Sequence, residues 1–149
     1  MNKINKIIEE LTGDNIYGEN LLVNGILEMG RIAFVPPENR GSEYDMYIHT
    51  NDPGKYPHFH VRQVGRDNIH FKWDKCIRLD VPEYFSHGKG YRGVIPDKKI
   101  EREVIKILSK KHPKYNVTYW EYAVQLWNEN NSDVQLPDDL QMPDYSKLR

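Results

Sequence analysis

The sequence has little cysteine, no long apolar run and almost no net charge. Cys76 is the only cysteine among 149 residues, so an internal disulfide is excluded. No stretch stays apolar over the roughly 20 residues that a membrane-spanning helix needs, and charges interrupt the first twelve residues, unlike a signal peptide. We therefore expect a cytoplasmic protein with no role in a membrane.

Several spacings that mark familiar sites are also absent. The chain has no His-Glu-x-x-His or Cys-x-x-Cys pair for zinc, and no glycine pattern of the Walker A or Rossmann type. Its length fits one hydrophobic core. We predict a single domain over residues 1–130, followed by an extended acidic and proline-containing tail over residues 131–149 that either wraps the domain or binds a partner.

The charges that are present are unevenly distributed. From Glu9 to Asp52 there are nine acids against two bases, whereas from Lys89 to Lys114 there are nine bases against three acids. Such polarity can steer a partner or pair two copies of the chain, although solvated faces would give the same pattern. We expect another protein as the partner, with nucleic acid and a homo-oligomer as alternatives.

The spacing of apolar residues predicts an α+β fold. Helical spacing occurs in residues 2–11 and 96–111, and again after Thr118, where Thr118-x-x-Glu121 has the pattern of a capping box. The intervening segments predict a mainly antiparallel, curved sheet of about five or six strands, with the two C-terminal helices packed on it. The expected strands are residues 21–23, 26–29, 31–35, 44–50, 57–64 and 69–73, with residues 76–79 as a further candidate.

The hairpin formed by residues 44–50 and 57–64 is the centre of this prediction. If Thr50 pairs with Pro57, Tyr47 lies opposite His60, and side chains then alternate between the two faces of the sheet. One face receives Tyr47, His49, His58, His60 and Arg62, and the other receives Met46, Ile48, Phe59 and Val61. The second set is the better candidate for the core.

The segment after this hairpin leaves its register open. A four-residue turn would place Phe71 and Trp73 on the face with the histidines, whereas a turn of odd length would place His70 there. Asp74 and Lys75 are predicted to form a turn between two short strands.

The histidines suggest a metal site. His58 and His60 share a face, and His49 across the hairpin could complete three nitrogen ligands for a divalent metal, zinc first. A carboxylate from Asp45, Asp52 or Asp74 could orient a ring or act as a base. The alternative is that the histidines make structural hydrogen bonds and that the protein has no cofactor.

A glycine-rich loop gives a second candidate site. His87, Lys89 and Arg92, with Tyr91, lie between three glycines, and such a set could supply the acid, base and cation needed to cleave RNA. A surface loop without chemistry is the alternative.

The first C-terminal helix carries basic residues along one face. Four cations that recur at helical spacing could lie along a phosphate backbone, or could simply face solvent. They are Lys99, Arg102, Lys106 and Lys110.

Residues 44–130 also resemble a known family. Asn51-Asp52 and the strand Pro57-His58-Phe59-His60-Val61 carry the likeness to a small bacterial family of unknown function. That family has a Pro-Pro-His-x-His-Val strand and is often encoded beside toxin–antitoxin-type genes. Tyr56 stands where the first proline of that motif is usual. The resemblance implies the fold outline but no reaction.

No complete catalytic set can be assembled from these residues. We therefore predict an accessory or regulatory binding protein of bacterial or phage mobile-element type, either toxin–antitoxin-like or an inhibitor of a host protein or nucleic-acid enzyme. The alternatives are a metal-dependent or RNase-like hydrolase, which would use the histidine hairpin or the loop from His87 to Arg92, and a nucleic-acid-binding module.

Overall fold

The described part of the chain combines one antiparallel sheet with two α-helices, which confirms the α+β prediction. A computed structural model describes residues 30–50, 56–67, 70–86 and 93–149. The predicted N-terminal helix and the strands predicted before residue 30 lie outside these ranges. The strands are β1 (Arg31–Ala33), β2 (Tyr44–His49), β3 (His58–Val64), β4 (Phe71–Arg78) and β5 (Tyr84–Phe85), and the helices are α4 (Lys98–Leu108), α5 (Tyr119–Asn130) and the short 3-10 helices η1 (Pro37–Asn39) and η2 (Tyr145–Lys147).

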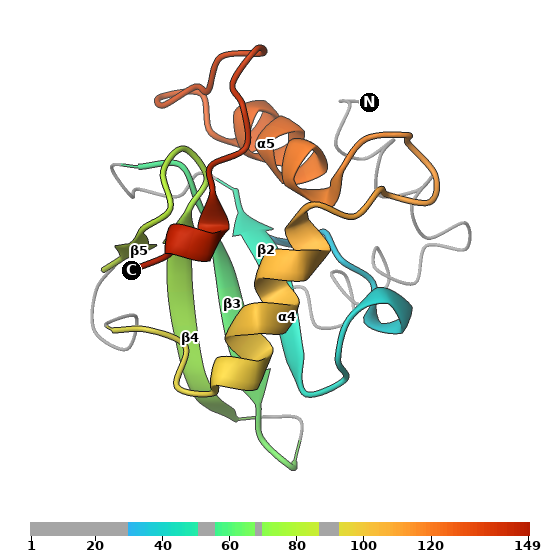
Figure 1. Cartoon of the computed structure of the whole chain (residues 1–149), viewed down its shortest axis with the longest axis vertical. Coiled ribbons are helices and arrows are strands. Elements are labelled where there is room, and N and C mark those ends of the chain that lie inside the picture. The colour runs from blue at the N-terminus through green and yellow to red at the C-terminus, as the bar shows by residue number, and fades with distance from the viewer. Residues whose placement is uncertain (1–29, 51–55, 68–69, 87–92) are drawn as a thin grey trace.

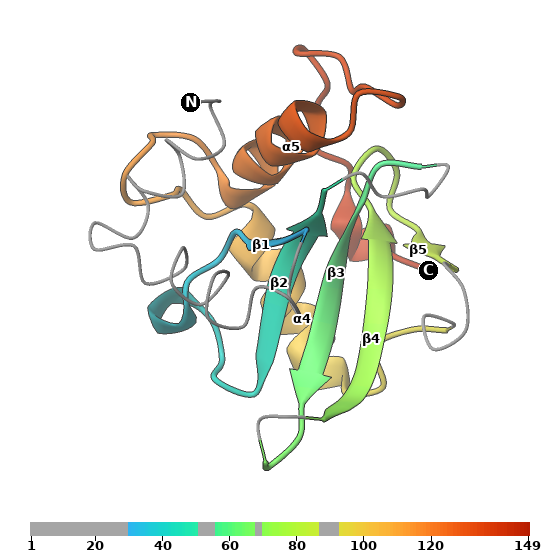
Figure 2. The same cartoon turned by 180° about the vertical axis from the view of Figure 1, so that it is seen from behind.

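The five strands follow one another in chain order, and the helices cover one side of the sheet. α4 crosses in front of the sheet in Figure 1 and lies behind it in Figure 2, while α5 packs at one end of β2. The opposite side of β2, β3 and β4 carries neither α4 nor α5 across it in Figure 2. Among the described residues, no helix has the length and hydropathy needed to cross a membrane.

Both helices begin where local side chains satisfy their first backbone amides. Asp97 accepts hydrogen bonds from the amides of Lys99 (2.9 Å) and Ile100 (3.4 Å). Thr118 and Glu121 form the predicted capping box, with N–H to oxygen distances of 3.0 and 3.1 Å. The first helix ends at Leu108 and not at residue 111 as predicted, because Lys111 pairs with Thr118 in an isolated β-bridge.

The β2–β3 register agrees with the predicted one, since Tyr47 lies opposite His60 and Met46 opposite Val61. Alternation then sends every second side chain toward the helices. Met46, Ile48, Phe59 and Val61 are all 0% exposed and belong to the hydrophobic core beneath α4 and α5. The alternate side chains, which include Tyr47 and His60, face away from α4, although the His58 ring lies 5.2 Å from the ring of Trp127 in α5.

The predicted turn at Asp74 and Lys75 is wrong. β4 runs without interruption from Phe71 to Arg78 because both residues pair with β3, Asp74 opposite Arg62 and Lys75 opposite Val61. Continuous cross-strand pairing outweighs the local turn preference of an Asp-Lys pair. As a result, Cys76 lies directly opposite His60.

An irregularity between Gln63 and Val64 settles the register that the sequence left open. Gln63 pairs with Trp73 but Val64 pairs with Phe71, so the two aromatic rings are sent to opposite faces. Trp73 packs against the core, whereas the Arg62 guanidinium lies 3.9 Å from the centre of the Phe71 ring. His70 is exposed and bonds to Asp67 at 2.7 Å.

The C-terminal residues lie against the domain. Leu136 and Tyr145 are part of the same hydrophobic core, and the Tyr145 hydroxyl donates to the Arg78 carbonyl at 2.6 Å. The Trp127 indole N–H donates to the Val134 carbonyl at 2.7 Å. Of the two alternatives for this tail, contact with the domain is the one observed.

Candidate functional site

The side of the sheet that faces away from α4 is lined by polar and aromatic groups. We call it the histidine face and define it by side chains that β2, β3 and β4 present together: Asp45, Tyr47, His49, His58, His60, Arg62, Asp74 and Cys76. Four of these side chains, those of Tyr47, His58, His60 and Cys76, are at most 2% exposed. Burial of so many polar groups on one face requires partners for them.

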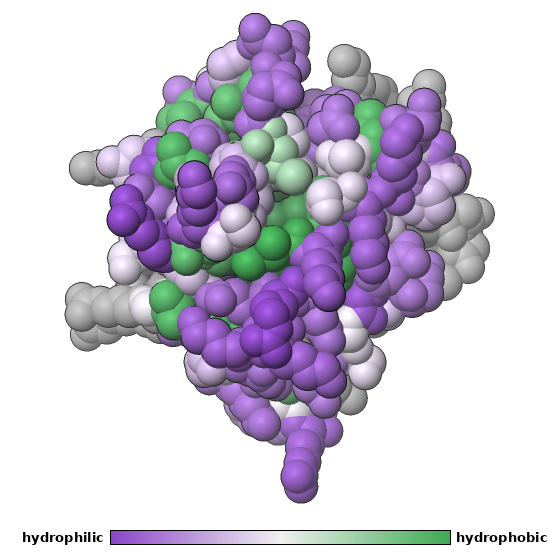
Figure 3. Space-filling view, viewed as in Figure 1, coloured by the Kyte–Doolittle hydropathy of each residue, from purple (hydrophilic) through white to green (hydrophobic). Residues whose placement is uncertain are grey.

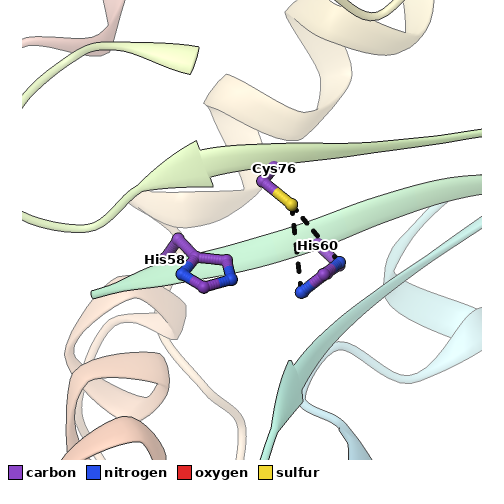
Figure 4. Close-up of side chains that lie close together, drawn as sticks. All are labelled: His58, His60 and Cys76. Atoms are coloured by element: carbon purple, nitrogen blue, oxygen red, sulfur yellow. Dashed lines mark hydrogen bonds between the residues drawn. The ribbon is translucent and has the colours of Figure 1, made fainter. Parts of the chain in front are cut away.

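Three metal-ligand types meet at the centre of this face. The ligand atoms of His58, His60 and Cys76 all lie within 4.8 Å of one another, and all three residues are buried. His58 and His60 project from alternate positions of β3, and Cys76 reaches them from β4 (Figure 4). Two imidazoles and a thiol are the donors that zinc takes in proteins, so this group could hold a metal ion.

Hydrogen bonds fix which nitrogen of each ring carries the proton. His58 Nδ1 lies 2.7 Å from the Tyr56 carbonyl oxygen, and His60 Nδ1 lies 3.3 Å from Asp74 Oδ1. A carbonyl or carboxylate oxygen can only accept, so both protons belong on Nδ1. In each neutral ring Nε2 is then the nitrogen with the lone pair that a metal needs.

The sulfur and nitrogen spacings are close to those of a coordinated ion. Cys76 Sγ lies 3.5 Å from Nδ1 and 3.9 Å from Nε2 of His60. A tetrahedral zinc with ordinary bond lengths would separate a sulfur and a nitrogen ligand by about 3.5 Å. Because Nδ1 carries the proton, the spacing that matters is the 3.9 Å to Nε2, and the sulfur and this nitrogen would have to move closer together to share an ion.

Tyr47 and Asp74 hold His60 in place. The Tyr47 ring stacks on the His60 ring at 4.7 Å with an interplanar angle of 17°, and its hydroxyl donates to Asp74 Oδ2. The other carboxylate oxygen faces His60. A carboxylate that accepts from the far side of a ligating imidazole is the usual outer partner of a zinc-bound histidine.

A second group on the same face is charged. Asp45 Oδ2 accepts from Arg62 Nε at 2.8 Å. Burial nevertheless raises the pKa of Asp45 to about 6, while the positive charge of Arg31 opposes the shift. Burial also lowers the pKa of Arg31, whose guanidinium lies 5.1 Å from the centre of the Tyr47 ring.

The structure brings some of the predicted site residues together and separates others. His49 has its ring 4.8 Å from that of His60, but Cys76 and not His49 completes the close group of three. Asp74 contacts His60, whereas Asp45 pairs with Arg62. The predictions for Asp52, and those for His87, Lys89, Tyr91 and Arg92, fall outside the described residues.

Cys76 is absent from the metal ligands predicted from the sequence. Asp74 is among the carboxylates predicted near the histidines, and Cys76 is two residues further along, so a continuous strand places both on one face. The predicted turn at Asp74-Lys75 would interrupt that strand, and so the pattern does not point to Cys76.

The predicted basic face of the first helix is exposed. Lys99, Arg102, Lys106 and Lys110 are all exposed, and Figure 3 shows mainly hydrophilic residues over α4. Only Lys106 and Lys110 of these four line a pocket, which lies between this helix and η1.

No protein-family model matches the chain, and neither do any curated proteins or solved structures. The resemblance based on Pro57 to Val61 therefore stays a prediction.

Proposed function

We propose that the protein binds a zinc ion through His58 Nε2, His60 Nε2 and Cys76 Sγ, and that this ion stabilises the histidine face of a regulatory binding protein. The observation that carries the proposal is the meeting of three buried ligand groups within 4.8 Å on two neighbouring strands. Soft thiolate and imidazole donors favour zinc over magnesium or calcium, which prefer oxygen.

The hydrogen bonds at Nδ1 of His58 and His60 support the same set of zinc ligands. Tyr56 and Asp74 each take the Nδ1 proton of one histidine, so both rings are held in the tautomer that offers Nε2.

Burial favours a stabilising ion over a hydrolytic one. His58, His60 and Cys76 are each 0% exposed. A catalytic zinc needs a position that substrate can reach, whereas a structural zinc contributes its binding energy to folding. The regulatory role is part of the proposal, on the ground that metal occupancy would set how much of the chain is folded.

The test is zinc titration of metal-free, reduced protein, followed by calorimetry and thermal unfolding. We expect one zinc per chain and a rise in stability of about 2.7 kcal/mol when the zinc concentration is a hundred times Kd. Cys76→Ser and His60→Ala should abolish this rise.

His70→Ala is the matched control, because His70 is an exposed histidine whose ring bonds to Asp67, away from the three proposed ligands. It should bind zinc as the parent protein does. Equal zinc binding by the parent protein and by Cys76→Ser would refute the proposed ligand set. A zinc-dependent hydrolysis of peptide or phosphate esters would instead assign the ion to catalysis.

A further inference from the structure

A pocket of about 490 Å³ lies on the side of the sheet that α4 covers, opposite the histidine face. It opens between η1 and the second half of α4, with Tyr44 and Tyr119 among its lining residues. This volume falls in the range of sites that enclose small organic ligands.

The Tyr44 hydroxyl is the unusual polar group of this pocket. Tyr44 is 1% exposed, and its hydroxyl makes no hydrogen bond of ordinary geometry with any residue in the described ranges, although Glu103 and the Gly41 backbone lie nearby. The Tyr119 hydroxyl, by contrast, accepts from Asn39 Nδ2 at 2.6 Å. A buried hydroxyl without a partner is unfavourable, and a ligand with a polar group could supply one.

The pocket is positively charged. Four of its lining side chains are basic and two are acidic: Arg40, Lys106, Lys110 and Lys111 against Glu38 and Glu103. Lys106 lies in the last turn of α4 and Lys110 follows the end of the helix, and both line the pocket. Within the described part of the chain neither has an ion-pair or hydrogen-bond partner, whereas Lys111 Nζ donates to Asn116 at 3.1 Å.

Arg40 places a guanidinium at the rim of the pocket. It donates to the backbone carbonyls of Val35 (3.1 Å), Gly41 (2.9 Å) and Tyr44.

Gly41 keeps the pocket wall open. A Cβ at this position would lie 2.9 Å from the Tyr44 ring and 3.2 Å from Glu103 Oε2. Any side chain there would therefore push two lining residues toward the pocket.

From these features we infer that the pocket binds a small phosphorylated organic molecule of the nucleoside monophosphate type. Lys106 and Lys110 bind the phosphate, because two adjacent ammonium groups match its charge. Tyr44 donates to an oxygen of the organic part, and Glu103 accepts from its hydroxyl or amino groups. This inference does not depend on the zinc site, which is on the other face of the sheet.

The test is calorimetric or NMR titration of the full chain with the four ribonucleoside monophosphates, with inorganic phosphate as a second probe. We expect at least one nucleotide to bind more tightly than phosphate, with an affinity that falls as salt is added. Lys106→Gln and Lys110→Gln should each raise its Kd about fivefold.

Two matched controls separate the pocket from the rest of the basic face. Lys99→Gln and Arg102→Gln lie on the same exposed face of α4 but do not line the pocket. Neither should change the nucleotide Kd. If they weaken binding as much as Lys106→Gln does, the ligand lies along the helix surface and the pocket is refuted.

Tyr44→Phe tests whether the Tyr44 hydroxyl binds the ligand or only supports the fold. It removes only the hydroxyl, so we expect about a fivefold rise in Kd with no loss of thermal stability. A loss of stability without a change in Kd would overturn the role given to Tyr44. Failure of every mononucleotide to bind at millimolar concentration, or tighter binding of a single-stranded oligonucleotide than of any mononucleotide, would overturn the proposal itself.

Discussion

Both faces of the sheet contain fully buried side chains, but the two sets differ in chemistry. Toward the helices, Phe59 and Val61 are 0% exposed among apolar neighbours, and on the other side His58 and His60 are also 0% exposed. Burying apolar surface stabilises a fold, whereas burying an imidazole or a thiol does so only if its polar atoms find partners. Burial on the first face is explained by apolar packing, and burial of polar groups on the second supports the proposal of a metal site there.

The largest loss of stability should separate two variants at adjacent positions of β3. Phe59→Ala should lower the free energy of unfolding by about 3–5 kcal/mol because it leaves a cavity in the core. His60→Ala, measured with a chelator present, should lower it by clearly less. Urea unfolding of both variants checks this, and equal losses in the chelated state would mean that the histidine face is simply a second core.

The next largest effect is expected at Asp74, which contacts Nδ1 of His60. Asp74→Asn should raise the zinc Kd about 10- to 100-fold, because Asp74 orients His60 through its Nδ1 proton. Competition with a chromophoric chelator measures this constant. Asp67→Asn is the control, since Asp67 bonds the exposed His70, and a similar effect there would argue against a specific role for Asp74.

A smaller effect is expected at the capping box of α5. Thr118→Ala removes the hydroxyl that accepts from the Glu121 amide, and should cost about 1 kcal/mol of stability. The zinc Kd measured under folding conditions should not change. A weakened zinc site in this variant would show that the two faces are coupled and not independent.

The smallest effect concerns pH. Burial lowers the pKa of His112, and its Nδ1 accepts from the Lys114 amide at 3.0 Å. The unfolded chain then takes up a proton near pH 6.5 that the folded chain does not, so this stability is present above that pH and lost as the pH falls. His112→Asn keeps an acceptor and should reduce the loss of stability between pH 7.5 and 5 by less than about 1 kcal/mol. Thermal unfolding at the two pH values, with zinc removed, measures this difference. An unchanged difference would contradict the neutral state of His112.

Local pattern in the sequence was enough to predict the hairpin but not the complete site. Alternation separates Met46 and Phe59 from Tyr47 and His60, and the observed register agrees with that separation. The place of Cys76 depends on β4 pairing with β3 over its whole length, and the irregularity at Gln63 sets which side each β4 residue faces. Such long-range pairing depends on contacts between strands and has no signature in the local sequence.

X-ray absorption at the zinc edge of the loaded protein tests the central claim most directly. We predict one sulfur at about 2.3 Å and nitrogen neighbours at about 2.0 Å from the ion, as expected for Cys76 with His58 and His60. The sulfur signal should disappear in Cys76→Ser. A zinc surrounded only by oxygen and nitrogen in the parent protein, or no bound zinc at all, would contradict the proposed site.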